Sequence, residues 1–136
     1  MTATLVDTSA LYAVLDRDDV HHRAATTTWH RLLERYEHEG ASLVATSYVL
    51  VETSALVQRR LGMDATRALH DQIVPVLDVV WVDPELHATA VTALLAAGRR
   101  DISLVDWICF ELARQRSITT AFAFDDDFSR QGLLPA

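Results

Sequence analysis

Two aspartates stand directly after predicted strands, near opposite ends of the sequence. Asp7 ends the short apolar run of residues 3–6, and Asp125 follows the apolar run of residues 118–124 in the same way. In an open parallel sheet, the loops beyond the carboxyl ends of the strands converge on one point, where ligands collect. We therefore expect the two carboxylates to lie close together.

Two further acids belong to predicted helices and interrupt apolar surroundings. Each has three apolar neighbours at helical spacing, which are Tyr48, Ala55 and Leu56 around Glu52, and Cys109, Phe110 and Ala113 around Asp106. A lone ionised carboxylate on a buried face is costly unless it is paired or bound to a metal ion. The spacing predicts that both acids lie on buried faces.

One cause accounts for Asp7, Glu52, Asp106 and Asp125 together, namely a cluster of oxygen ligands for a hard divalent cation. Mg²⁺ and Mn²⁺ favour carboxylate and water over imidazole or thiolate. Carboxylates that share a site without a cation raise one another's pKa, and a bound cation removes that repulsion. The pattern indicates a Mg²⁺ or Mn²⁺ site.

Each acid also has a simpler interpretation, which the sequence leaves open. Asp7 can cap the helix after the first strand, and Asp106 sits at the capping-box position of its own helix. Glu52 can pair with Arg59, and the acidic run 125–127 can be a solvated turn. Four separate explanations are then needed where one cation site suffices.

The composition is that of one globular domain. The chain has 136 residues, 50% hydrophobic and 23% charged, and Cys109 is its only cysteine, which its apolar neighbours predict to be buried. No secretory signal and no membrane span are predicted, so we expect a cytoplasmic location. The net charge of −7 argues against a basic face that holds nucleic acid alone. Phosphate binding would need cations from solution.

Apolar strands alternate with helices along the chain. We expect strands at residues 3–6, 43–45, 79–82 and 118–124, and helices at 8–15, 25–36, 46–61, 65–76, 84–97 and 103–115, with a short acidic helix after residue 124. Gly40, Gly62 and Gly98 stand where helices should end. The sequence contains no Asn-Gly or Asp-Gly hairpin turn. This order favours an α/β fold whose parallel sheet is covered by helices on both faces.

Four short motifs stand in order along the chain: Asp7-Thr8-Ser9-Ala10-Leu11, Glu52, Ser103-Leu104-Val105-Asp106 and Phe124-Asp125-Asp126-Asp127-Phe128. Together they resemble the motifs of PIN-domain ribonucleases, and the size and layout are similar to the VapC-type toxins of bacterial toxin–antitoxin pairs. The resemblance implies one PIN domain over residues 1–136. It implies three layers, α/β/α, with a central parallel sheet of four to five strands and about seven helices.

The resemblance also implies roles and partners. It implies that four acids bind the metal ion and are catalytic: Asp7, Glu52, Asp106 and Asp125. Asp127 would be an auxiliary acid, and the Ser9 hydroxyl would help hold the cluster together. The implied activity is a Mg²⁺- or Mn²⁺-dependent endoribonuclease that hydrolyses RNA phosphodiester bonds. The implied partners are a small antitoxin protein and a second copy of the chain in a homodimer. The family commonly has Thr or Ser where this chain has Ala123, so one supporting hydrogen bond is expected to be missing.

All twelve basic residues are arginines. The candidates for phosphate contacts beside the acidic site are Arg59, Arg60, Arg99 and Arg100, with Arg114 and Arg116 as further possibilities. Arginines at helix ends also serve as partners of the helix dipole.

Competing enzyme classes fit the sequence less well. Response-regulator receivers and haloacid-dehalogenase-type phosphatases need a lysine beside the phosphate, and this chain has none. The six histidines form no His-Glu-x-x-His zinc motif and are predicted on the surface. The remaining alternative is a non-catalytic PIN-like module that binds RNA or a protein. Such a module has no physical reason to keep buried acids at all four motif positions.

Overall fold

The fold is built on a five-stranded sheet in which all strands are parallel. The computed structural model describes residues 2–136. The strands are β1 (Ala3–Val6), β2 (Ser42–Thr46), β3 (Asp78–Val80), β4 (Thr120–Phe122) and β5 (Leu134–Pro135). Their order across the sheet is β3-β2-β1-β4-β5. The predicted parallel sheet of four to five strands is confirmed.

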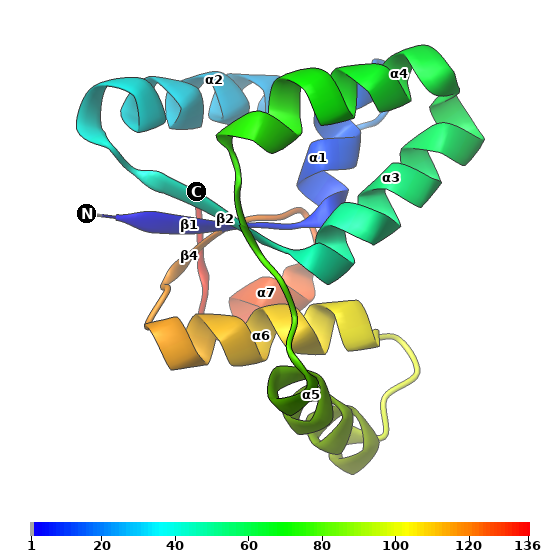
Figure 1. The fold of residues 1–136 in the computed structure, drawn as a ribbon, viewed down its shortest axis with the longest axis vertical. Helices are drawn as coiled ribbons and strands as arrows, with labels where there is room; N and C mark the ends of the chain where they lie inside the picture. The colour runs from blue at the N-terminus through cyan, green and yellow to red at the C-terminus, as the bar shows by residue number, and fades with distance from the viewer. Residues whose placement is uncertain (1) are drawn as a thin grey trace.

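Helices cover both faces of the sheet, as predicted (Figure 1). One face carries α1 (Thr8–Leu15), α2 (His22–Glu39), α3 (Ser47–Leu61) and α4 (Met63–Ala68), and the other carries α5 (Pro84–Ala97), α6 (Leu104–Arg116) and α7 (Asp126–Arg130). A π turn, η1 (Leu69–Ile73), and a 3-10 turn, η2 (Val74–Val76), lead from α4 to β3. The described residues thus form three layers with seven α-helices.

The strand order reverses at β1, which pairs with β2 on one side and with β4 on the other. In open α/β sheets, ligands bind at such a switch point, outside the carboxyl ends of the strands. The Asp7 N–H donates to the Phe122 carbonyl oxygen at 3.0 Å, which extends the β1–β4 pairing by one residue. The fold therefore brings the two strand-end aspartate segments together.

Capping residues set where five helices begin. The side chains that cap α1, α3, α5, α6 and α7 belong to Asp7, Thr46, Asp83, Ser103 and Asp125. Gly40 and Gly98 end α2 and α5 at φ values of 68° and 65°, a left-handed conformation that glycine adopts at little cost. The predicted ends of these two helices are confirmed.

Two predicted strands are shorter than expected. The run 79–82 belongs to the sheet only as far as Val80, because the next residue, Trp81, points into solvent and is 71% exposed. The run 118–124 is limited to β4, because β1 offers pairing partners only from Thr4 to Val6.

The segments around two prolines also differ from the prediction. The expected helix 65–76 breaks into α4, η1 and η2, and Pro75 lies in the last of these turns, where its missing N–H prevents a regular helix. The strand β5 was not predicted, because only two residues, one of them Pro135, pair with β4.

The core lies on both faces of the central strands. Leu5 and Val6 of β1 are fully buried, and Cys109 of α6 is fully buried as predicted. Phe128 anchors the short helix α7, because its ring packs edge-on against Phe110 of α6 with centroids 5.0 Å apart. None of the helices within residues 2–136 is long and apolar enough to cross a membrane.

Replacement of Phe128 with alanine is expected to lower the free energy of unfolding by about 3–5 kcal/mol, because the buried ring leaves a cavity between α6 and α7. Chemical denaturation measures this. Trp81→Ala is the matched control, since that ring is 71% exposed and its loss should cost much less. Equal effects of the two substitutions would contradict the role of Phe128 as an anchor.

Candidate active site

Asp7 lies at the centre of the candidate site, at the carboxyl end of β1. Its side chain is 4% exposed and caps α1. One carboxylate oxygen, Oδ2, accepts hydrogen bonds from the Ser9 N–H at 3.1 Å and from the Ser9 hydroxyl at 2.7 Å. Burial raises the pKa of Asp7 in spite of these two bonds, and the charge of Glu52 raises it further. Asp7 is thus a carboxylate that would gain from a nearby cation.

Ser9 connects the two strand-end segments. Its hydroxyl donates to Asp7 and accepts the backbone N–H of Phe124 at 3.0 Å, across 115 positions of the sequence. Phe124 immediately precedes Asp125. The geometry is that expected of a hydroxyl that holds the cluster together, and it supplies a link between the segments although Ala123 has no hydroxyl.

Asp106 both caps its helix and interacts with the other acids. Its carboxylate accepts the Ser103 N–H at 3.3 Å while its own N–H donates to the Ser103 hydroxyl at 3.2 Å, which completes a capping box. Its pKa is nevertheless raised to about 6, first by burial and then by the charges of Asp7 and Asp125. Three of the four predicted acids therefore share one electrostatic environment.

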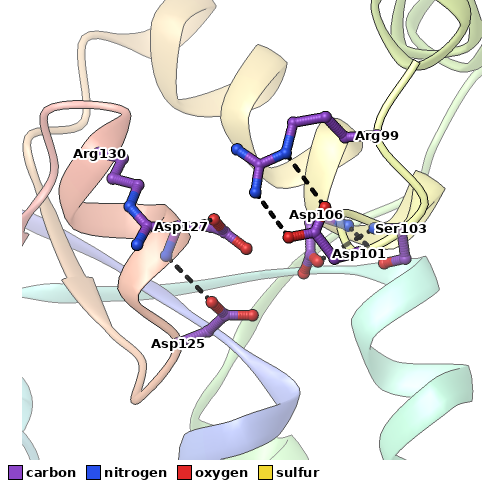
Figure 2. A network of polar contacts seen from close by, with 7 residues as sticks. All are labelled: Arg99, Asp101, Ser103, Asp106, Asp125, Asp127 and Arg130. Carbon is purple, nitrogen blue, oxygen red and sulfur yellow. Dashed lines mark hydrogen bonds and ion pairs between the residues drawn. The ribbon is translucent and has the colours of Figure 1, made fainter. Parts of the chain in front are cut away.

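Asp125 and Asp127 enter from the start of α7 (Figure 2). The carboxylate of Asp125 accepts the Asp127 N–H at 3.0 Å and caps α7. Asp127 is 6% exposed, and its carboxylate accepts a hydrogen bond from Arg130 at 3.0 Å. Figure 2 shows Asp125 and Asp127 on the α7 side and Asp106 on the α6 side of the same region. The acidic run is thus a partly buried helix start and not a solvated turn.

Glu52 is exposed, so the prediction that it lies on a buried face is wrong. The buried residue is its neighbour Thr53, whose hydroxyl donates to the Thr8 hydroxyl at 3.1 Å and holds α3 against α1. This contact keeps Glu52 close enough to Asp7 to raise the pKa of Asp7. Within the described part of the chain, no ion pair joins Glu52 to Arg59.

The acids influence one another electrostatically without already forming a metal-binding group. Among residues 2–136, no three His, Cys, Asp or Glu side chains are gathered as metal ligands. A divalent cation would therefore have to draw at least one carboxylate inward. The exposed, longer side chain of Glu52 has the most freedom to move.

Of the four predicted RNA-binding arginines, Arg99 and Arg60 have defined partners. Arg99 binds Asp101 through two hydrogen bonds of 3.1 and 2.6 Å, beside Asp106 (Figure 2). Arg60 lies over the ring of Tyr12, 5.6 Å from its centroid. Arg59 and Arg100 are exposed. The six histidines are exposed or half-buried, so the surface prediction for them is confirmed in outline.

The thiol of Cys109 lies beneath the acids. Burial raises its pKa well above the ordinary value, and the charges of Asp7 and Asp106 raise it further. A thiol held in the protonated form is a poor nucleophile. The geometry thus favours carboxylate chemistry at this edge of the sheet.

Residues 4–133 match the sequence model of the PIN domain family. The chain is a PIN-domain protein. It is 31% identical over 130 residues to the 23S rRNA-specific endonuclease VapC20 of Mycobacterium tuberculosis, and the match covers 95% of this chain and 94% of the relative. This PIN domain therefore belongs with the VapC-type ribonuclease toxins, as the motifs indicated.

Solved structures agree with this membership. The crystal structure of Mycobacterium tuberculosis VapC20, described as a Sarcin-Ricin loop cleaving toxin, aligns with a TM-score of 0.83 and 30% identity over 96% of both chains. The structure of VapBC2 from Rickettsia felis, bound to a promoter DNA fragment, aligns with a TM-score of 0.70 at 14% identity, over 99% of this PIN domain and 98% of that chain. The second similarity shows the common fold.

Sequence reasoning missed the ion pairs that border the acids. Arg130 lies three residues after Asp127, a helical spacing that could have predicted their contact. The Arg99–Asp101 pair lies in the loop before α6. A loop has no helical spacing that would predict a contact, so the sequence held no comparable indication of this pair. Both pairs place positive charge beside the carboxylates of this PIN domain.

Asp106→Asn is expected to stabilise the metal-free protein at about pH 8 but not at about pH 4. The raised pKa means that the folded state binds the proton more tightly than the unfolded state, so stability is lost as the pH rises from about 4 through about 6. Asparagine removes this loss while it can still accept the Ser103 N–H. We expect a gain on the order of 1 kcal/mol, since partial exposure screens the repulsion.

Urea denaturation at the two pH values measures the difference. Asp71→Asn, at an exposed acid in η1, is the control and should show little change at either pH. A stability loss of the same size at both pH values would indicate that Asp106 serves only to cap α6.

Proposed function

We propose that this PIN domain is a divalent-cation-dependent endoribonuclease whose substrate is a loop of large-subunit ribosomal RNA. One observation carries the proposal: at the switch point of the sheet, burial and the charges of Asp7 and Asp125 raise the pKa of Asp106 to about 6. The choice of substrate is supported by the 31% identity to a 23S rRNA-specific endonuclease over nearly the whole chain. A cytoplasmic location follows from such a substrate.

The donor set fits Mg²⁺ or Mn²⁺. We propose Asp7, Glu52, Asp106 and Asp125 as the residues that hold the ion, since all four offer hard oxygen ligands. The raised pKa of Asp106 supports this, because a cation would stabilise its charged form and offset the repulsion from its neighbours. When bound, the ion supplies Lewis-acid activation of water and charge stabilisation at the phosphate.

The other residues of the chain orient these acids. Ser9 fixes one oxygen of Asp7, and the Ser103 N–H fixes one oxygen of Asp106. Asp127 serves as the auxiliary acid, and its ion pair with Arg130 limits the negative charge that it adds. Arg99, beside the acids, can attract the phosphate backbone.

The proposed partners follow from membership of the VapC type. A small antitoxin protein would silence the nuclease, and a second copy of the chain would form a homodimer. A non-catalytic binding module remains the contrasting function, and the cleavage experiment distinguishes it from the proposal.

Asp7→Asn and Asp106→Asn should abolish cleavage of ribosomal RNA while the fold is kept, because asparagine can still accept the Ser9 N–H at position 7 and the Ser103 N–H at position 106. The loss should exceed the about 10–100-fold that replacement of a supporting residue costs. Primer extension on 23S rRNA incubated with the purified protein and Mg²⁺ or Mn²⁺ locates and quantifies the cut. Asp71→Asn, far from the acids along the chain, should cleave as the parent does.

A chelator should stop cleavage, and added Mn²⁺ should restore it. Cleavage that persists without divalent cations, or that survives both substitutions, would refute the proposed chemistry. RNA binding without any cut would favour the non-catalytic module.

A further inference from the structure

A hollow of about 360 Å³ opens beside the acids, and nothing in the proposed chemistry uses it. Its size falls in the range of about 300–1,000 Å³ typical of small-molecule sites. Six side chains from two helices and two loops define its walls: Tyr12, Asp19, His21, Leu56, Arg60 and Phe124. Ser9 and Asp125 also line it, so the hollow is continuous with the acidic cluster.

One wall is a pair of stacked rings. The His21 and Phe124 rings lie nearly parallel, with centroids 4.4 Å apart and 9° between the planes. Phe124 is held in place by the hydrogen bond from its N–H to the Ser9 hydroxyl. His21 covers Phe124 with one face and is otherwise exposed. A stack that is fixed on one side and open to solvent is a platform for a further flat ring.

Arg60 adds a positive charge to the lining of the hollow. Arg60 lies over the ring of Tyr12 at 5.6 Å and is exposed. Glu52, Leu56 and Arg60 follow one another at four-residue spacing, so they share one face of α3. Leu56 and Arg60 line the hollow, so its α3 side carries an arginine that can meet a phosphate, on the same helix face as Glu52.

We propose that this hollow binds a nucleobase of the RNA strand, next to the phosphate held at the acids. The inference rests on the proposed function, since it places the base beside the cut. Aromatic and histidine rings stack on unpaired bases, and arginine binds phosphate or stacks on the base, which matches the His21–Phe124 stack and Arg60 in the lining. An acidic surface of a partner protein is the alternative occupant. It would pair with Arg60 but would leave the exposed ring stack unused, so a nucleobase fits the hollow better.

Equilibrium binding to short RNA strands tests the proposal without knowledge of the natural sequence. Fluorescence anisotropy in Mg²⁺ compares oligo(A), oligo(U) and oligo(C) with an abasic ribose-phosphate strand of the same length and charge. The protein carries Asp7→Asn so that the strands stay intact. We expect at least one base-bearing strand to bind about tenfold or more tightly than the abasic strand, the effect of one stacked base.

His21→Ala should remove most of this base-dependent difference and leave binding of the abasic strand unchanged. The substitution should not unfold the protein, because the His21 side chain is exposed and makes no capping bond to α2. His21→Tyr keeps a flat ring and should restore the difference. His38→Ala is the matched control, since it removes an exposed histidine near the far end of α2.

Two results would overturn the inference. The first is equal affinity for base-bearing and abasic strands, and the second is a base-dependent difference that survives His21→Ala. Cleavage of ribosomal RNA by the unsubstituted protein is measured in parallel. Cleavage together with equal binding of base-bearing and abasic strands would refute the hollow as a base site but support the nuclease. Base-dependent binding without cleavage would support the base site but refute the nuclease.

Discussion

Repulsion among carboxylates at the β1–β4 switch point is the constraint on which the rest of this site depends. Each aspartate is held there by a local hydrogen bond, from Ser9 to Asp7, from Ser103 to Asp106 and from the Asp127 N–H to Asp125. Each also stands in the first turn or at the cap of a helix, where the positive end of the helix dipole favours an anion. Three helix starts thus offset part of the charge that the cluster accumulates.

In this arrangement, one acid can both cap a helix and take part in a cation site. Capping and cation binding look like alternatives in the sequence, because either one explains a lone acid. In the structure, Asp106 completes a capping box and still has a pKa of about 6 under the influence of Asp7 and Asp125. The cap fixes one carboxylate oxygen, and the remaining charge is available to the site.

The sequence predicted the features that depend on local chemistry. Proline and glycine positions, capping residues and apolar runs located most helices and four of the five strands along the chain. It failed where burial depends on packing between distant segments. Glu52 has apolar neighbours at helical spacing, but Thr53 makes the buried contact to Thr8, so the helix is turned away from the predicted face. The hollow beside Phe124 could not be predicted, since its walls come from two helices and two loops that are far apart in the sequence.

The net charge of −7 remains the main obstacle for a protein that binds RNA. Arg99 and Arg130 lie beside the acids but are each engaged with an aspartate. Attraction by these arginines alone is weak, so cations and ring stacking have to contribute to affinity.

The hydrogen bond between the Ser9 hydroxyl and the Phe124 N–H joins positions 115 residues apart. During synthesis the amino-terminal half can pair β1 with β2 before β4 exists. The strand that delivers Asp125 reaches its place only after nearly all of the described chain has been made. The acidic cluster is thus incomplete until residue 125 has been synthesised and β4 has paired with β1.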